Sequence, residues 1–213
     1  MTSPVTKAIL IVVLGLLLVA CNDGSNNRVE IRWIDSDLVS LTVNEAMEVL
    51  ESGELTSERY VEALITQIEA NEPALNAFIY FDADTLRADA VAADAIRASG
   101  ASVGPLHGLP IIIKDSFDVA GLPTTAGTPA LASNVPGING AAVQRLFDAG
   151  AILVGKANLH ELSSGGTTNN AFTGATHNPY DLSRVPGGSS GGNGAALAAR
   201  FAPFALGEDT GGS

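Results

Sequence analysis

An unbroken apolar run constrains the fold of this chain more than any other feature. The run Leu-Pro-Ile-Ile-Ile covers residues 109–113, follows Gly108 and ends at Lys114. A strand with one face in water alternates apolar and polar residues, so a continuous run favours a strand covered on both faces. Residues 152–154 repeat the pattern after a helical segment over 141–149. Strands that alternate with helices predict an α/β fold with a mixed, mostly parallel sheet flanked by helices.

Start and stop signals divide the rest of the chain. Thr42 and Glu45 form a capping-box pattern before a first helix, which Gly53 stops. The other expected elements are a helix from residue 56 or 57 to 71–73, a strand over 75–81, helices over 82–98 and 195–200, and a strand over 201–206. Residues 163–194 are rich in Gly, Ser, Thr and Asn, and so long a loop inside a compact domain is usually functional.

The N-terminus has the pattern of an export signal. An apolar stretch over residues 8–20 lies between Lys7 and Cys21. A membrane span needs about 20 apolar residues, so the stretch fits the core of a signal peptide better. Leu-Val-Ala-Cys resembles the bacterial lipobox, whose cysteine is acylated; a secretory signal with an incidental cysteine is the alternative. We expect a lipoprotein signal peptide over 1–20, a lipidated Cys21 and tether over 21–40, and an exported folded domain over 41–213, anchored to a bacterial membrane.

Charge and cysteine content exclude some classes of partner and of stabilisation. The formal net charge is −12, and phosphate contacts need Lys and Arg, so the acidic balance argues against a nucleic-acid partner. Cys21 is the only cysteine, which rules out a disulfide within the chain. The fold must therefore be held by a hydrophobic core, for which an apolar fraction of 46% suffices in one domain.

Two serines in glycine-rich turns and one lysine form the candidate chemistry. Ser189 lies in the run Gly-Gly-Ser-Ser-Gly-Gly, Ser213 closes the run Glu-Asp-Thr-Gly-Gly-Ser, and Lys114 stands at the tip of the apolar run. Glycines let a substrate approach closely and leave N–H groups free to face an anion. Burial disfavours a charged lysine and can make it a base near neutral pH. The alternatives are a lysine paired with Asp115 and a glycine turn whose serine only caps a helix.

Other catalytic arrangements fit the sequence less well. Residues 187–191 match the GxSxG nucleophile elbow, but that elbow must follow a strand directly, and here a polar segment with two prolines precedes it. The glycine run lacks the Gly-Lys-Ser or Gly-Lys-Thr ending of a phosphate loop. His107, His160 and His177 give little support for a serine–histidine triad, and no metal-binding spacing such as HExxH is present. We therefore expect no metal, and lysine is the best available base for a serine.

Five ordered motifs strongly resemble the amidase signature family. They span residues 108–115, 124–128, 155–158, 186–192 and 209–213. The resemblance runs from about Leu41 to the last residue, and the order and spacing of independent motifs argue against chance. It implies an amidase signature fold that hydrolyses a small-molecule carboxamide without metal or organic cofactor. Known members include fatty acid amide hydrolases, bacterial peptide and malonamide amidases, and an amidotransferase subunit that acts on tRNA-bound glutamate. The export signal favours the exported bacterial amidases among them.

The resemblance also implies a role for each motif residue. Ser213 is the expected nucleophile, Ser189 the serine after a cis peptide bond that relays the proton, and Lys114 the base that receives it. A serine hydroxyl is a poor nucleophile until a base accepts its proton, and a neutral lysine can do so through a second hydroxyl. The remaining implied residues are the oxyanion-hole N–H groups of Thr210, Gly211, Gly212 and Ser213, the supporting residues Ser190 and Asp209, and the substrate contact Ser163.

The chain departs from the family in its length. Family members continue well past the nucleophile, so we expect a domain truncated after Ser213, lacking further strands and much of the acyl-binding pocket. An inactive fragment or a membrane-tethered remnant that binds an amide is therefore the alternative to an active amidase. An amidotransferase subunit fits less well, because a lipobox and an acidic surface suit neither the cytoplasm nor tRNA. Neither the substrate nor the oligomeric state follows from the sequence.

Overall fold

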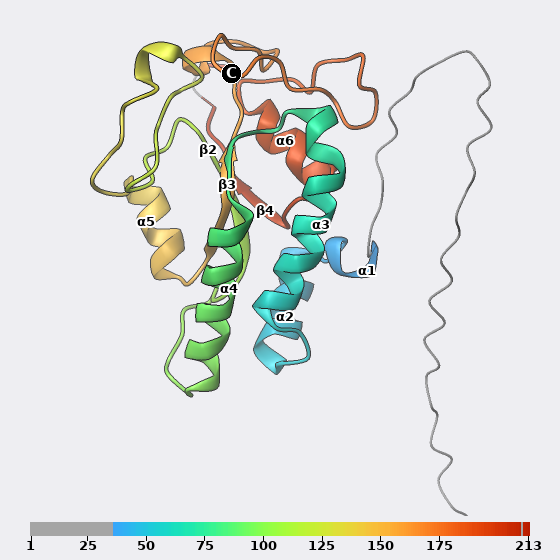
Figure 1. Cartoon of the computed structure of the whole chain (residues 1–213), viewed down its shortest axis with the longest axis vertical. Coiled ribbons are helices and arrows are strands. Elements are labelled where there is room, and N and C mark those ends of the chain that lie inside the picture. The colour runs from blue at the N-terminus through green and yellow to red at the C-terminus, as the bar shows by residue number, and fades with distance from the viewer. Residues whose placement is uncertain (1–35, 210) are drawn as a thin grey trace, which may run out of the picture.

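A four-stranded sheet lies at the centre of the protein. The structure is a computed structural model that describes residues 36–209 and 211–213. In this part of the chain the strands are β1 (Phe78–Phe81), β2 (Pro110–Lys114), β3 (Ile152–Ala157) and β4 (Phe204–Leu206). Their order in the sheet is β1-β3-β2-β4, with β2 parallel to β3 and β4 and β1 antiparallel to β3 (Figure 1). The expected mixed, mostly parallel sheet is confirmed.

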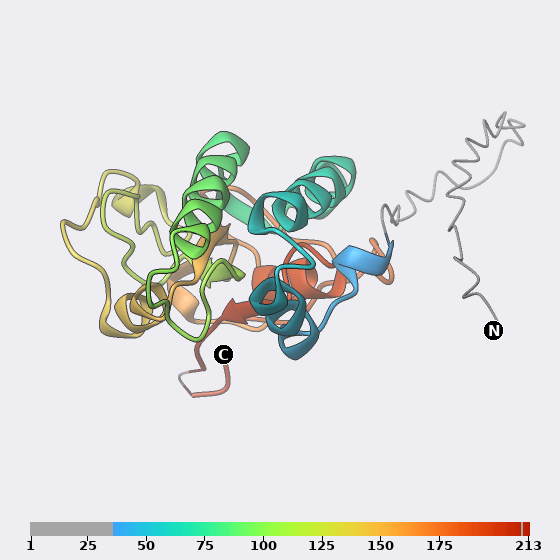
Figure 2. The same ribbon diagram turned by 90° about the horizontal axis from the view of Figure 1, so that it is seen from below.

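Helices cover both faces of this sheet. They are α1 (Ser36–Val39), α2 (Val43–Ser52), α3 (Ser57–Leu75), α4 (Ala83–Ala98), α5 (Ala141–Asp148) and α6 (Gly191–Ala198), with short 3-10 turns η1 (Pro129–Leu131) and η2 (Glu161–Ser163). Figure 2 shows α3 and α4 on one side of the sheet and α2 and α5 on the other. The capping box expected at Thr42 is present, with the Glu45 carboxylate accepting from the Thr42 N–H at 2.8 Å.

The two faces explain the continuous apolar run in β2. Ile112 belongs to a buried cluster with residues of α3, α4 and α6, whereas Ile111 and Ile113 belong to a second cluster with residues of α2 and α5. All three side chains are fully buried. Successive side chains of a strand point to opposite faces, so a strand between two helical layers has no position for a polar residue until it ends. That end is Lys114.

The carboxyl ends of the parallel strands meet at one edge. Because β2 and β4 run in the same direction, Lys114 and the residues after Leu206 arrive there together. The long loops over 115–140 and 158–190 gather at the same end of the molecule, the upper end in Figure 1, where the C-terminus also lies. Ligands of α/β proteins bind at this edge, so the fold brings the glycine-rich segments to the position where a site is expected.

Several element boundaries differ from the expected ones. α3 continues past Asn71 and Pro73 to Leu75, where Asn76 ends it in the left-handed conformation and donates its N–H to the Glu72 carbonyl. β1 accordingly begins three residues later than expected, β3 runs on to residue 157, and β4 is only three residues long. The proline falls in the last turn of α3, and the carbonyl that it leaves without a helical donor is that of Glu69, an exposed residue.

α6 begins four residues earlier than expected, inside the glycine run. A Cβ on Gly191 would collide with the side chain of Thr168, and one on Gly192 would collide with the backbone of Asn158. Glycine has a low helix propensity, which is why the sequence predicts a loop for these residues. Close packing of the helix start on two loops requires the missing Cβ, so tertiary contact overrides propensity.

Ordered structure also begins earlier than expected. α1 lies within the segment 21–40 that the sequence assigns to a tether, and the side chain of Val39 is 5% exposed in the cluster that includes α2. The folded part therefore starts before residue 41. The expected signal peptide and Cys21 lie outside the described residues. Within residues 36–209 and 211–213, no helix combines the length and the apolar character needed to cross a bilayer.

Candidate active site

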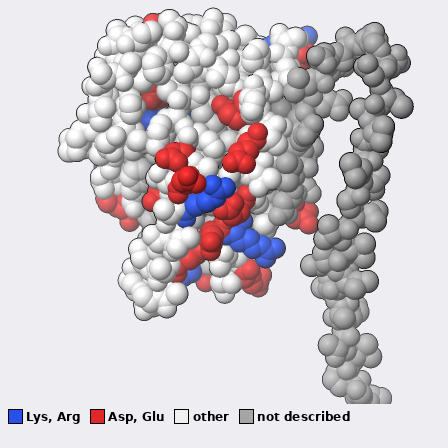
Figure 3. Space-filling view, viewed as in Figure 1, with Lys and Arg blue, Asp and Glu red and all other residues white. Residues whose placement is uncertain are grey.

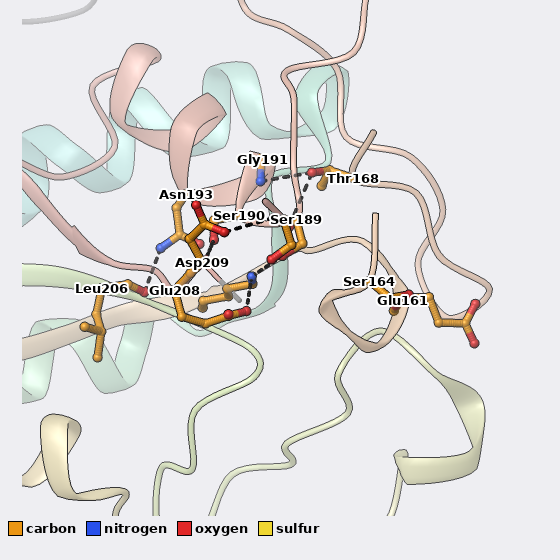
Figure 4. Close-up of polar contacts among 12 residues, drawn as sticks. Glu161, Ser164, Thr168, Ser189, Ser190, Gly191, Asn193, Leu206, Glu208 and Asp209 are labelled. Carbon is orange, nitrogen blue, oxygen red and sulfur yellow. Dashed lines mark hydrogen bonds and ion pairs between the residues drawn. The ribbon is translucent and has the colours of Figure 1, made fainter. Parts of the chain in front are cut away.

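Lys114 lies at the centre of a buried polar cluster. Its side chain is fully buried, and its Nζ donates to the hydroxyl of Ser189 at 2.5 Å and to Oε1 of Glu208 at 2.5 Å (Figure 4). The three residues come from the end of β2, the glycine-rich loop before α6 and the turn after β4. A buried amine is costly unless its donors are satisfied, and here a hydroxyl and a carboxylate satisfy it.

The backbone around Ser189 is held from two sides. The peptide bond between Gly188 and Ser189 is cis. The Ser189 carbonyl accepts the N–H of His160 at 3.0 Å. On the other side, the hydroxyl of Thr168 donates to the Gly187 carbonyl at 2.6 Å and accepts the Gly191 N–H at 2.9 Å. The loop is therefore fixed before and after Ser189, which points its hydroxyl at Lys114.

The start of α6 ties down the turn that follows β4. Ser190 stands at the N-cap of this helix, but its hydroxyl makes no capping hydrogen bond and donates instead to the Glu208 carbonyl at 2.9 Å. One helical turn later, Asn193 Nδ2 donates to the Leu206 carbonyl at 2.9 Å. The serine of the glycine turn thus connects two segments of the site, in contrast to the alternative in which it only caps the helix.

The turn over residues 208–213 gathers backbone donors. Oδ1 of Asp209 accepts the N–H groups of Gly212 and Ser213, each at 2.9 Å. Gly211 and Gly212 have φ values of 77° and 90°, a region in which side chains are strained. Asp209 thus braces its own turn, as expected of a supporting residue, and the oxyanion-hole role of these N–H groups stays a prediction. Thr210 lies outside the described residues, and contact between the Ser213 and Ser189 hydroxyls stays a prediction.

Ser163 lies in the short helical turn η2 of the loop that follows β3. Its φ is 55° and that of Leu162 is 53°, so two consecutive residues other than glycine adopt the left-handed conformation. Its hydroxyl oxygen is buried and has no hydrogen-bond partner among the described residues. Strained backbone and an unsatisfied hydroxyl are both more frequent at ligand sites than elsewhere.

A second buried lysine lies next to this cluster. Lys156 of β3 is fully buried and pairs with Oδ1 of Asp115 at 2.6 Å, and it donates to Thr124 Oγ1 at 3.0 Å. The other Asp115 oxygen accepts the N–H and the hydroxyl of Thr125. Burial lowers the pKa of Lys156, and the attraction of Asp115 opposes that shift. Asp115 therefore pairs with Lys156, and the alternative that pairs it with Lys114 is wrong.

The histidines serve as local hydrogen-bonding groups. Nε2 of His107 is 2.8 Å from the Ala93 carbonyl, Nδ1 of His160 is 3.1 Å from the Thr167 hydroxyl, and Nδ1 of His177 is 2.9 Å from the Leu182 carbonyl. No group of three or more His, Cys, Asp and Glu residues with metal-site geometry occurs in the described part of the chain. Lys114, and not a histidine, is the side chain that meets the Ser189 hydroxyl.

Sequence reasoning missed Glu208, Thr168 and Asn193. Glu208 lies between Gly207 and the last motif, and no spacing in the sequence links it to Lys114. Its place two residues beyond a strand parallel to β2 is the signal that identifies it, because both strand ends reach the same edge.

Comparison with known proteins identifies the family. A family model described as Amidase matches residues 59–213. The chain belongs to the amidase signature family. Its relatives include a glutamyl-tRNA(Gln) amidotransferase subunit of Acidothermus cellulolyticus, which is 44% identical over 178 residues, or 84% of this chain and 35% of the relative. The chain thus spans about a third of the length of the curated relatives it matches.

Solved structures of amidases share the fold. A fatty acid amide hydrolase superposes on this chain with a TM-score of 0.80 and 27% identity, over 84% of this chain and 32% of that protein. Native peptide amidase from Stenotrophomonas maltophilia gives a TM-score of 0.70 and 37% identity, over 76% of this chain and 34% of that protein.

Proposed function

We propose that this protein hydrolyses the C–N bond of a small-molecule carboxamide, with Ser213 as nucleophile, Ser189 as proton relay and Lys114 as base. The observation that carries the proposal is the 2.5 Å contact between Lys114 Nζ and Ser189 Oγ in a fully buried setting. A relay of this kind needs a base that meets a hydroxyl away from water, because solvent would otherwise compete for the proton.

The proposed reaction proceeds through an acyl-enzyme. The Ser213 oxygen attacks the carbonyl carbon while its proton passes to Ser189, and the Ser189 proton passes to Lys114. The N–H groups of the 210–213 turn stabilise the oxyanion, and each such donor contributes about 2.7 to 4 kcal/mol to the transition state. Lys114 then returns the proton through Ser189 to the leaving nitrogen, and water hydrolyses the ester. The unpartnered hydroxyl of Ser163 supports a role in binding the amide.

Substitution of two relay members tests the proposal. Ser213→Ala should abolish hydrolysis of a carboxamide panel, measured as released ammonia or amine, and Lys114→Ala should lower it by about 10²- to 10⁴-fold. Ser52→Ala is the matched control, because Ser52 is exposed at the end of α2, far along the chain from the relay, and its hydroxyl bonds only to the nearby backbone of Val49 and Glu54. Circular dichroism and urea unfolding show whether each variant keeps its fold. Unchanged turnover in either relay variant contradicts the proposal.

An amidotransferase subunit is the second candidate, and the 42 to 48% identity to subunits of glutamyl-tRNA(Gln) amidotransferases favours it. The charge distribution favours the hydrolase. The net charge is −12, and the basic side chains on the face in Figure 3 lie among acidic ones, as Arg87 does between Glu62 and Asp84. Salt-dependent binding of tRNA, together with transfer of ammonia from glutamine to a tRNA-bound glutamate, would support the amidotransferase instead.

A further inference from the structure

Glu208 is the carboxylate that meets Lys114. Its Oε1 lies 2.5 Å from Lys114 Nζ, and its side chain is 23% exposed, whereas the lysine side chain is completely buried. The lysine therefore lies between a hydroxyl that can deliver a proton and an anion that can stabilise the resulting charge (Figure 4).

The backbone fixes this carboxylate in place. The Glu208 carbonyl accepts the Ser190 hydroxyl, and the Leu206 carbonyl accepts Asn193 Nδ2, both at 2.9 Å. Both donors come from the start of α6, which the packing of its glycines holds against the loops. An exposed ion pair contributes little because forming it costs the conformational entropy of two long side chains. For the pair of Lys114 and Glu208 this cost is smaller, because the lysine and the backbone of Glu208 are already ordered.

The other titratable groups around Lys114 have partners of their own within the described residues. β4 and α6 carry no titratable side chain. Lys156 of β3 and Asp115 after β2 pair with each other. Asp209 accepts two N–H groups of its own turn, and the His160 ring meets the Thr167 hydroxyl. Glu208 is thus the anion positioned to act on Lys114.

We propose that Glu208 is a positioning residue that holds the Lys114 side chain against Ser189 and stabilises the ammonium form that Lys114 takes during the reaction. This inference rests on the proposed hydrolase function. In the acylation step the bond from Ser213 Oγ to the carbonyl carbon forms, the carbonyl electron pair moves to oxygen, and one proton reaches Lys114 through Ser189. Glu208 stays a carboxylate throughout, so the step creates an ion pair from a neutral amine and an existing anion.

Two opposing effects determine the protonation of Lys114. Burial disfavours the ammonium, whereas an anion at hydrogen-bond distance favours it. The carboxylate therefore offsets part of the cost of forming a charge on Lys114 when the proton arrives. In serine–histidine–aspartate enzymes the aspartate acts on the imidazolium in the same way.

The pH profile of a Glu208→Gln variant tests this role. The amide keeps the shape and an oxygen acceptor but removes the charge. The acid limb of kcat/KM should move by about one to three pH units toward lower pH, and the plateau should fall by about 10-fold or more. The wild-type and variant profiles then converge at acid pH. Glu62→Gln, which removes an exposed carboxylate on α3, should leave the profile unchanged. An equal loss at every pH overturns the proposal, because a purely structural role gives that result.

An NMR titration separates this inference from the proposed function, because it needs no turnover. The chain has three lysines, Lys7, Lys114 and Lys156, so selective labelling of lysine gives few signals. The titration midpoint of Lys114 should move to lower pH in Glu208→Gln, while Lys156 serves as internal control. An unchanged Lys114 midpoint overturns the role of Glu208. Retained hydrolysis in Lys114→Ala would instead overturn the proposed function, whatever the titration shows.

Discussion

Lys114 and Lys156 lie on neighbouring strands, fully buried, and have different anionic partners. In the register of the sheet Lys156 stands opposite Ile113, one residue before Lys114. Its counter-ion is Asp115, at 2.6 Å and equally buried. A pair of this kind adds little net stability, but the loss of one member leaves an uncompensated charge inside the protein. The pair therefore fixes the loop after β2 at the point where Lys114 must be positioned.

Lys156→Met tests this interpretation. The variant keeps the apolar stem and removes the charge, so the Asp115 carboxylate is left buried without a counter-ion. The free energy of unfolding should fall by about 3 to 5 kcal/mol, measured by urea denaturation. Addition of Asp115→Asn should recover part of the loss, because the amide still accepts from Thr125. The control is Arg87→Met, which breaks an exposed pair worth about 0 to 1 kcal/mol. A loss no larger than that of the control contradicts the interpretation.

The pairing of each buried lysine with its carboxylate cannot be predicted from the sequence. Asp115 is adjacent to Lys114 in the chain, and that neighbourhood suggests a pair. Consecutive residues at a strand end point in opposite directions, so Asp115 turns away toward Lys156 while Lys114 meets Glu208, 94 residues further along the chain. Motifs identify the residue types at the site, but pairings between segments depend on the three-dimensional register.

At the scale of elements, α6 shows how packing determines the glycine pattern. Gly192 has no space for a Cβ, since the Asn158 backbone occupies it, whereas Gly194 in the same helix has nothing within 4 Å of that position. Gly192→Ala should destabilise the protein and move the loop that carries Ser189. Gly194→Ala should stabilise it by about 0.5 to 1 kcal/mol, because alanine is the better helix former. Urea unfolding of both variants measures the difference. Equal effects of the two substitutions would contradict the packing argument.

Elements with a local sequence signal are predictable, whereas elements that depend on tertiary packing are not. The position of β2 follows to within one residue, because an apolar run between two helical layers leaves a direct signal. A capping box and helical spacing locate α2, and an alanine-rich run locates α4. The first four residues of α6 are not predicted as helix, because glycine and asparagine favour loops. Their helical conformation depends on close packing against Thr168 and Asn158, which the sequence does not reveal.

At the scale of the whole molecule, the polar cluster lies at the loop end, and on the face seen in Figure 3 most charged side chains lie away from that end. Figure 3 shows Lys, Arg, Asp and Glu side chains mainly over α3 and α4, and the loop end largely without them. The acidic balance of −12 disfavours polyanionic partners for the chain as a whole. A neutral amide meets no such repulsion, so the charge distribution is compatible with the proposed substrate class.

The last prediction concerns where the protein resides. An apolar stretch, a small-residue sequence and a lone cysteine precede the folded part, and we propose that Cys21 is acylated and anchors the protein to a bacterial membrane. One acyl chain binds a membrane only weakly, so stable anchoring needs additional chains on the same cysteine. Cells fed labelled palmitate should yield labelled protein in the membrane fraction, and Cys21→Ser should yield unlabelled protein. Unlabelled wild-type protein rules out the anchor and leaves the export signal to be tested by fractionation alone.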